Sequence, residues 1–151
     1  MSAIRGRHTK STEIRLRMAL VRAGLTGWKL HFSTLPGKPD IYFPKRNVAV
    51  FVDGCFWHGC RSCGHIPKTN QAFWEAKIRS NSERDRRNKR KLSSAGISVV
   101  RIWEHSLKDR SSAAKAVAAI RIALATCNSL DRKGTTRRTT GSQIQPRRVC
   151  L

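Results

Sequence analysis

Acidic side chains are scarce in this sequence of 151 residues. Nine Asp and Glu stand against 31 Lys and Arg, which gives a formal net charge of +22. So large an excess of positive charge opposes compaction by self-repulsion, and a polyanion is the usual partner that offsets it. The imbalance therefore predicts nucleic-acid binding. Because so few carboxylates are present, each one is a candidate for a specific task.

Long apolar stretches are also missing. No run of about 18 apolar residues occurs, so no membrane span is expected. The opening residues, MSAIRGRHTK, contain no apolar segment of the kind that secretory signals carry. Five cysteines without an export signal favour metal binding over a disulfide framework. We therefore expect a cytoplasmic protein without disulfides.

The apolar pattern predicts alternating helices and strands. Helices are expected over residues 9–23, 70–95 and 111–127, the middle one as a single long helix or as two in tandem. Short strands are expected at 28–32, 40–43, 48–54 and 97–105, with the second and third forming a hairpin. This order favours an α/β or α+β domain over residues 1–127, with a mixed central sheet flanked by helices. Residues 128–151 are predicted to form a flexible basic tail.

Three of the cysteines lie in the segment FVDGCFWHGCRSC, residues 51–63. Cys60 and Cys63 have the Cys-x2-Cys spacing that places two sulfurs at adjacent corners of a tetrahedral zinc site, and Cys55 supplies a third. The fourth ligand is open between His65, close in sequence, and His105, at the end of the last expected strand. Buried free cysteines are the alternative, but three thiols so close together beside several glycines favour a structural zinc ion.

A Pro-Asp pair opens the strand expected at 40–43, and a second apolar strand follows within ten residues. This order is typical of PD-(D/E)xK nucleases, in which carboxylates at adjacent strand ends hold Mg²⁺ against a phosphodiester. The Glu/Asp-x-Lys motif expected on the second strand is absent, and Asp53 is the only charged residue there. Taken alone, Pro-Asp is also an ordinary way to begin a strand.

Longer segments resemble the very-short-patch repair (Vsr) endonucleases, which nick DNA at T·G mismatches left by deamination of 5-methylcytosine. The matching segments are AIRGRHTKSTEIRLRMAL, LPGKPDIYFP, VFVDGCFWHGC and FWEAKIRSNSERDRRNKRKLSSAGISVVRIWEH. The resemblance implies a restriction-endonuclease-like fold with a structural zinc ion, and a Mg²⁺-dependent, strand-nicking hydrolase of DNA mismatch repair. It further implies a bacterial, nucleoid-associated monomer that acts on double-stranded DNA with a T·G mismatch. Mismatch-repair proteins are further candidate partners.

The same resemblance assigns catalytic roles to single residues. Asp40 matches a metal-binding aspartate, His58 the histidine that activates the attacking water, and Glu13 an acid near the metal site. A further Mg²⁺ contact falls on the backbone carbonyl of Val52. Asp53 is expected either to add its carboxylate to the metal or to orient His58.

The zinc ligands implied by the resemblance are Cys55, Cys60, Cys63 and His105. Cys63 is offset by one residue from the family pattern, so His65 remains a rival ligand. Each of these residue types is an acceptable zinc ligand.

Aromatic residues interrupt the metal-binding segment. Phe56 and Trp57 match family positions that intercalate into DNA beside the mismatch, and Trp74 matches a third. A wedge of rings would replace base stacking lost when the duplex opens. Packing of these rings within the protein is the alternative.

The segment ERDRR begins at Glu83 and places Arg84 and Arg87 on one face of the expected helix. Contact with DNA phosphates and a merely solvated helix surface are equally compatible with this pattern. Asp85 could instead pair with a neighbouring arginine.

Two other functions remain open beside mismatch nicking. One is a nuclease of the same fold that acts in restriction or defence. The other is a zinc-stabilised DNA-binding module with little activity.

Overall fold

The computed structural model describes residues 7–131, with side chains placed over residues 11–127. Its helices and strands alternate along the chain much as the apolar pattern predicts. In order they are α1 (Arg7–Arg22), β1 (Lys29–Leu30), β2 (Ile41–Phe43), the 3-10 helix η1 (Pro44–Arg46), β3 (Val48–Asp53), α2 (Gln71–Ser94), β4 (Ser98–Trp103), the 3-10 helix η2 (Glu104–Leu107) and α3 (Arg110–Asp131).

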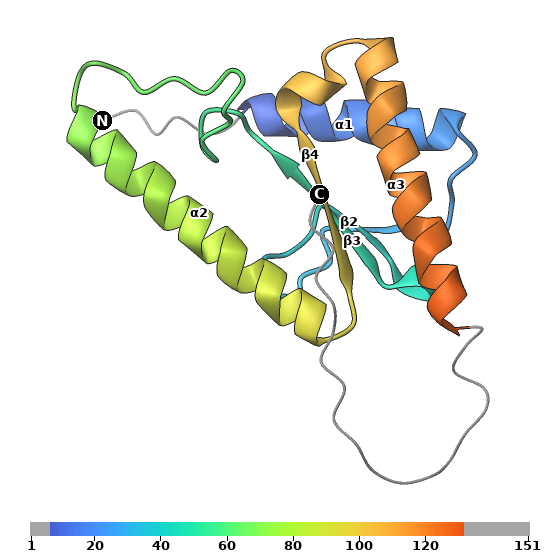
Figure 1. Cartoon of the computed structure of the whole chain (residues 1–151). Coiled ribbons are helices and arrows are strands. Elements are labelled where there is room, and N and C mark those ends of the chain that lie inside the picture. Colours follow the sequence, from blue (N-terminus) through green and yellow to red (C-terminus); the bar gives the residue numbers. More distant parts are fainter. Residues whose placement is uncertain (1–6, 132–151) are drawn as a thin grey trace, which may run out of the picture.

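The strands form one mixed sheet in the order β1-β2-β3-β4. The first three strands are antiparallel, and β3 pairs with β4 in parallel. Asn47 closes the β2–β3 hairpin in the left-handed region, at φ 50° and ψ 45°. Parallel strands require a crossover connection, which here contains the Cys/His segment and α2. Helices α1 and α3 cover one face of the sheet and α2 crosses the other (Figure 1).

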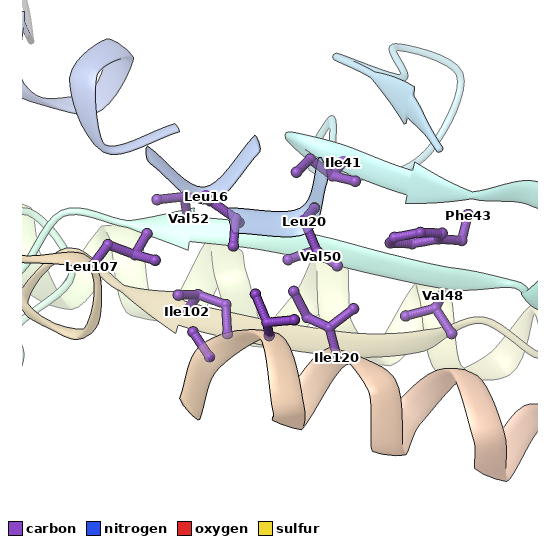
Figure 2. Close-up of a cluster of buried hydrophobic side chains, with 12 residues drawn as sticks. Leu16, Leu20, Ile41, Phe43, Val48, Val50, Val52, Ile102, Leu107 and Ile120 are labelled. Atoms are coloured by element: carbon purple, nitrogen blue, oxygen red, sulfur yellow. The ribbon is translucent and has the colours of Figure 1, made fainter. Parts of the chain in front are cut away.

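The main core lies between the sheet and the helices α1 and α3 (Figure 2). Alternate residues of each strand point into it, because successive side chains of a strand face opposite sides of the sheet. Leu16 and Leu20 of α1 and Ile120 of α3 are completely buried against them. Full burial of each such side chain contributes about 1.5–3 kcal/mol.

A smaller core lies on the opposite face, under the last turns of α2. Leu92 packs there with Tyr42, Ala49 and Ile97. Of the residues within α2, only Leu92 is fully buried. The remainder of the helix is therefore available to line a polar cleft over the same face of the sheet.

The expected mixed sheet flanked by helices is confirmed, and several boundaries differ. The middle helix is a single helix, and Gly96 ends it in the left-handed region at φ 73°. The last helix extends to Asp131, four residues into the segment expected to be a tail, and residues 132–151 lie outside the described part of the chain. Strand β4 ends at Trp103, so His105 lies in η2 rather than in the strand. Within residues 7–131, no helix has the length and apolarity needed to cross a membrane.

Candidate active site and metal centre

Two strand ends meet at one edge of the sheet and position the carboxylate of Asp40. Since β2 and β3 are antiparallel, the residue before β2 lies beside the end of β3. The backbone N–H of Val52 donates a hydrogen bond of 2.7 Å to Oδ2 of Asp40. The aspartate is thereby fixed at the edge where the sequence places the nuclease carboxylates.

Glu13 reaches the same place from α1. The ligand atoms of Glu13, His31 and Asp40 all lie within 4.8 Å of one another. Burial raises the pKa of Asp40, and the nearby negative charge of Glu13 adds to this, although the Val52 N–H opposes it. Two carboxylates at this separation are the donor set of a hard dication such as Mg²⁺.

A second cluster surrounds His58. Its Nδ1 lies 2.6 Å from Oδ2 of Asp85, on α2, and 3.8 Å from Oδ1 of Asp53. An ionised carboxylate only accepts hydrogen bonds, so this contact assigns the ring proton to Nδ1. Nε2 is then left with a free lone pair, as a general base requires.

Arg101 holds the two carboxylates of this cluster together. Its guanidinium donates to both oxygens of Asp53 and, over 2.8 Å, to Oδ2 of Asp85. Burial acts to raise the pKa of Asp85, but the hydrogen bonds from Arg101 and His58 outweigh it and hold that pKa below its ordinary value. The pKa of Arg101 is raised, because its hydrogen bonds to Asp53 and Asp85 outweigh the effect of its burial. Asp85 is therefore ionised at neutral pH.

A cleft of about 540 Å³ between the sheet and α2 joins the two clusters. Asp40 and His58 both line it, together with several basic side chains. Its lining residues include Lys38, Asp40, Asp53, His58, Arg84, Asp85, Lys89 and Arg101. Basic groups around a few carboxylates suit a polyanionic substrate that is brought to a cation site.

The Cys/His segment forms a compact cluster next to this cleft. Nδ1 of His105 lies 3.3 Å from the sulfur of Cys55, 3.5 Å from that of Cys60 and 3.4 Å from that of Cys63. The sulfurs of Cys60 and Cys63 are 3.6 Å apart. The edges of a tetrahedron with zinc–sulfur and zinc–nitrogen bonds of ordinary length are about 3.5–3.8 Å.

The chemistry of this cluster also fits zinc. Hydrogen bonding to Cys55 raises the pKa of Cys63 to about 12, because three crowded thiols cannot all ionise without a cation. A dication at the centre removes that obstacle. His105 completes the cluster. The ring of His65 instead lies beside Phe56, with the two ring centroids 6.2 Å apart. Of the two histidines left open by the sequence, the structure places His105 with the cysteines.

The metal-binding segment is held against η2 and α2 by further contacts. Oε2 of Glu104 accepts a hydrogen bond of 3.3 Å from the N–H of Cys55. Nδ2 of Asn81 donates over 3.0 Å to the carbonyl of Trp57. Gly59 sits so close to Ile78 that an added Cβ would lie 2.8 Å from Cγ2 of that side chain. The segment is therefore held on both sides.

The aromatic side chains expected to form a wedge contact one another. Phe56 meets Trp57 and Trp74 edge to face, with ring centroids 5.2 Å and 5.1 Å apart. Trp57 and Trp74 are 5.9 Å apart, and Phe73 extends the group from α2 with 60% of its surface exposed. Phe73 is a member that sequence reasoning missed. We call this group the aromatic cluster; it consists of the partly buried Phe56, Trp57 and Trp74 and the exposed Phe73.

The two arginines singled out on α2 have different surroundings. Arg84 lines the cleft, and its guanidinium lies 3.7 Å from Oδ1 of Asp85. Arg87 is exposed on the helix and is not among the residues that line the cleft. The geometry thus favours Arg84 over Arg87 as a group directed at the substrate.

Comparisons with known proteins agree with this geometry. The family model described as DNA mismatch endonuclease Vsr matches residues 1–65. The type II nicking enzyme V.NaeI of Lentzea aerocolonigenes is 54% identical over 68 residues, which cover 45% of this chain and 41% of that enzyme. The type II nicking enzyme V.XorIIP of Xanthomonas oryzae pv. oryzae is 40% identical over 111 residues, which cover 72% of this chain and 79% of that protein.

A third relative carries the family name itself. DNA mismatch endonuclease Vsr of Escherichia coli K12 is 38% identical over 108 residues, which cover 68% of this chain and 67% of that protein. The chain belongs to the Vsr family of DNA mismatch endonucleases.

Proposed function

We propose that this protein nicks one strand of duplex DNA beside a T·G mismatch, with Mg²⁺ held at Asp40 and with His58 as the general base. One observation carries the proposal: Asp40 and His58 line the same cleft. The segment that carries His58 also supplies rings of the aromatic cluster and thiols of the Cys/His cluster. The family and its nicking relatives support the reaction class.

The cation site consists of this chain's oxygen donors. Asp40 and Glu13 supply carboxylates, and the backbone carbonyl of Val52 is the further donor that the family resemblance implies. When bound there, Mg²⁺ supplies a Lewis acid that stabilises the charge developing on the phosphodiester. Asp53 helps to orient His58 and does not bind the metal, because both of its carboxylate oxygens accept hydrogen bonds from Arg101 and one of them lies 3.8 Å from Nδ1 of His58.

His58 accepts the proton of the attacking water at Nε2. Asp85 fixes the tautomer through Nδ1 and stabilises the positive charge that the imidazole gains. Arg101 prevents Asp85 and Asp53 from repelling each other. Arg84 and Lys89, on the α2 side of the cleft, are directed at the phosphates of the DNA.

The aromatic cluster provides the preference for a mismatch. Opening a base step costs a few kcal/mol, and a mismatched step costs less than a paired one. Rings held in advance by the Cys/His cluster and by Asn81 lose little freedom on insertion. Zinc at Cys55, Cys60, Cys63 and His105 has a structural role in this proposal, since four protein ligands leave no open position.

Cleavage of a panel of duplexes tests the proposal. Zinc-loaded protein is incubated with end-labelled duplexes that carry a T·G pair, the matched pair or another mismatch, with Mg²⁺ or with EDTA. The T·G duplex should be nicked fastest, on one strand, and EDTA should stop the reaction. Asp40→Ala should abolish nicking without loss of DNA binding. The control Glu83→Ala, which removes an exposed acid, should retain nicking.

Other outcomes identify the rival functions. Equal nicking of matched and mismatched duplexes would favour a nuclease of restriction or defence. Tight binding without nicking under any metal condition would favour a DNA-binding module. Either result would overturn the proposed function.

A further inference from the structure

His31 is a residue to which neither the sequence pattern nor the reaction proposed above gives a role. It follows β1 directly, and its backbone N–H donates to the carbonyl of Asp40 over 3.1 Å. Its Nε2 lies 3.1 Å from Oε1 of Glu13. The imidazole is thus fixed beside both carboxylates of the candidate cation site.

The charges around these carboxylates differ from those in the rest of the cleft. Asp53 and Asp85 are each paired with Arg101. Among residues 11–127, whose side chains are placed, no Lys or Arg nitrogen lies within 4.0 Å of the carboxylate of Glu13 or Asp40, although Lys and Arg number 31 in the whole sequence. In so basic a protein, two adjacent carboxylates without a basic side chain indicate a place kept for a metal cation.

The two side chains in contact at this site differ in their exposure to solvent. The side chain of Glu13 is 12% exposed and that of His31 is 66% exposed, so the imidazole is the more solvent-accessible partner of this contact. His31 also has a left-handed backbone, with φ of 44°, which non-glycine residues adopt at some cost. Its Nε2 and the two carboxylates are close enough to contact one ion, since their ligand atoms lie within 4.8 Å of one another.

We propose that His31 is a nitrogen ligand of the cation held by Glu13 and Asp40, so that this site binds Mn²⁺ in preference to Mg²⁺. The inference rests on the cation site of the proposed function. Imidazole nitrogen is a softer donor than carboxylate oxygen. It therefore strengthens the binding of first-row transition ions more than that of Mg²⁺, which takes oxygen ligands.

The competing role for His31 is that of a counter-ion to Glu13. The two roles predict opposite results when the imidazole is removed. Loss of a counter-ion strengthens the binding of every dication by a similar factor, because it leaves the site more negative. Loss of a ligand weakens the binding of Mn²⁺ and has little effect on that of Mg²⁺.

The test uses the zinc-loaded full chain without DNA, so that turnover does not enter. His31→Asn removes the imidazole and keeps a residue that tolerates positive φ. Lys29→Gln is the matched control, because it changes an exposed basic residue of β1, two positions before His31, that lies against Phe32 instead. Bound zinc and circular dichroism establish that each variant is folded.

Two measurements are made on each protein. Titration with Mn²⁺, followed by the electron paramagnetic resonance signal of the free ion, gives the Mn²⁺ affinity, and competition with Mg²⁺ gives that of Mg²⁺. Spin-echo modulation from ¹⁴N reports directly whether a nitrogen is bonded to Mn²⁺. His31→Asn should weaken Mn²⁺ binding about tenfold or more, since even residues that support a ligand contribute 10- to 100-fold. It should also remove the nitrogen modulation that Lys29→Gln retains.

The outcomes separate this inference from the function on which it rests. Unchanged Mn²⁺ affinity and modulation in His31→Asn would overturn the inference and leave the proposed reaction intact. Equal strengthening for Mn²⁺ and Mg²⁺ would overturn it in favour of the counter-ion. If Asp40→Asn still bound both ions as the wild type does, the cation site of the proposed function would itself be refuted.

Discussion

Substitution of Asp85 by Asn tests the catalytic cluster with the least change of shape. Asp85 accepts hydrogen bonds from His58, over 2.6 Å, and from Arg101, over 2.8 Å. The amide of Asn can donate to Nδ1, which would move the ring proton to Nε2 and remove the base. General-base catalysis contributes about 10²–10⁴-fold, so we expect the nicking rate of Asp85→Asn to fall at least about 100-fold.

Stability should change much less than the rate. The variant loses a hydrogen-bonded charge pair, but Arg101 keeps both contacts to Asp53. A hydrogen bond to a charged group contributes about 1.5–3 kcal/mol, which is the expected loss in the free energy of unfolding. Urea denaturation measures this loss, and a folded protein at the assay temperature makes the rate interpretable.

The assay is a single-turnover reaction with enzyme in excess over a labelled T·G duplex, which isolates the chemical step from binding and product release. Glu83→Gln is the control, because it removes an exposed acid two positions earlier on α2. Affinity for the uncleaved duplex should stay near that of the wild type in both variants. A rate for Asp85→Asn within about threefold of the wild type would show that Asp85 does not serve His58, and the assigned tautomer would be wrong.

Three further predictions concern the metal centre, the aromatic cluster and α3. Cys60→Ser should release the bound zinc and unfold the protein, because metal binding at such a site is folding free energy, and a folded, metal-free Cys60→Ser protein would contradict a structural role. Trp57→Ala should lower the ratio of the T·G cleavage rate to the matched cleavage rate, because it removes about 1–3 kcal/mol of base–aromatic stacking. The affinity for DNA, measured at one salt concentration, should change little. An unchanged ratio would assign the Trp57 ring to packing alone. Asp109 accepts hydrogen bonds from the backbone and side chain of Ser112 at the start of α3, and these lower its pKa. Asp109→Ala should therefore lower the Tm at pH 7 by about 2–4 °C. The pKa of Asp109 is lower in the folded state than in the unfolded state, so its stabilising contribution is complete above the unfolded pKa of about 3.9 and is lost as pH falls through the folded value. The difference in Tm between Asp109→Ala and the wild type should therefore shrink in acid. A difference that stays constant with pH would refute the role of Asp109 as the N-cap of α3.

Most of the fold was predictable because its signals are local. The hairpin of β2 and β3 follows from two short apolar runs with Pro44 between them. The end of α2 follows from Gly96, whose positive φ no bulky residue adopts easily. The second partner of β3 was not predictable in this way, because the pairing of β3 with β4 joins residues that are about 50 positions apart in the sequence.

The same distinction between local signals and distant contacts applies to the candidate site. Cys55, Cys60 and Cys63 are close in sequence, whereas the choice between His65 and His105 depends on where β4 ends in space. Arg101 was overlooked although a lone arginine within the apolar run VVRIW is a signal in itself. A partly buried charge in a strand is stabilised by a carboxylate partner, and Arg101 has two.

The sequence contains little indication of the positions of His31 and Phe73. The left-handed backbone of His31 results from the way the chain leaves β1, and it is not visible in the residue type. Phe73 precedes Trp74 on a helix whose apolar face is narrow, so the sequence gives no reason to expect it among the exposed rings.

The Cys/His cluster also bears on how the chain reaches its fold. Cys55 follows the end of β3 and His105 follows the end of β4, so one ion would join the ends of two parallel strands across a separation of 50 residues. Closing a loop of that length by a cross-link corresponds to about 4 kcal/mol of chain entropy. Pairing between such distant strands forms late in folding, since the entropy of loop closure must be overcome first. A metal bound only after that pairing slows unfolding more than it speeds folding, so zinc would govern how long the nuclease stays folded rather than how quickly it folds.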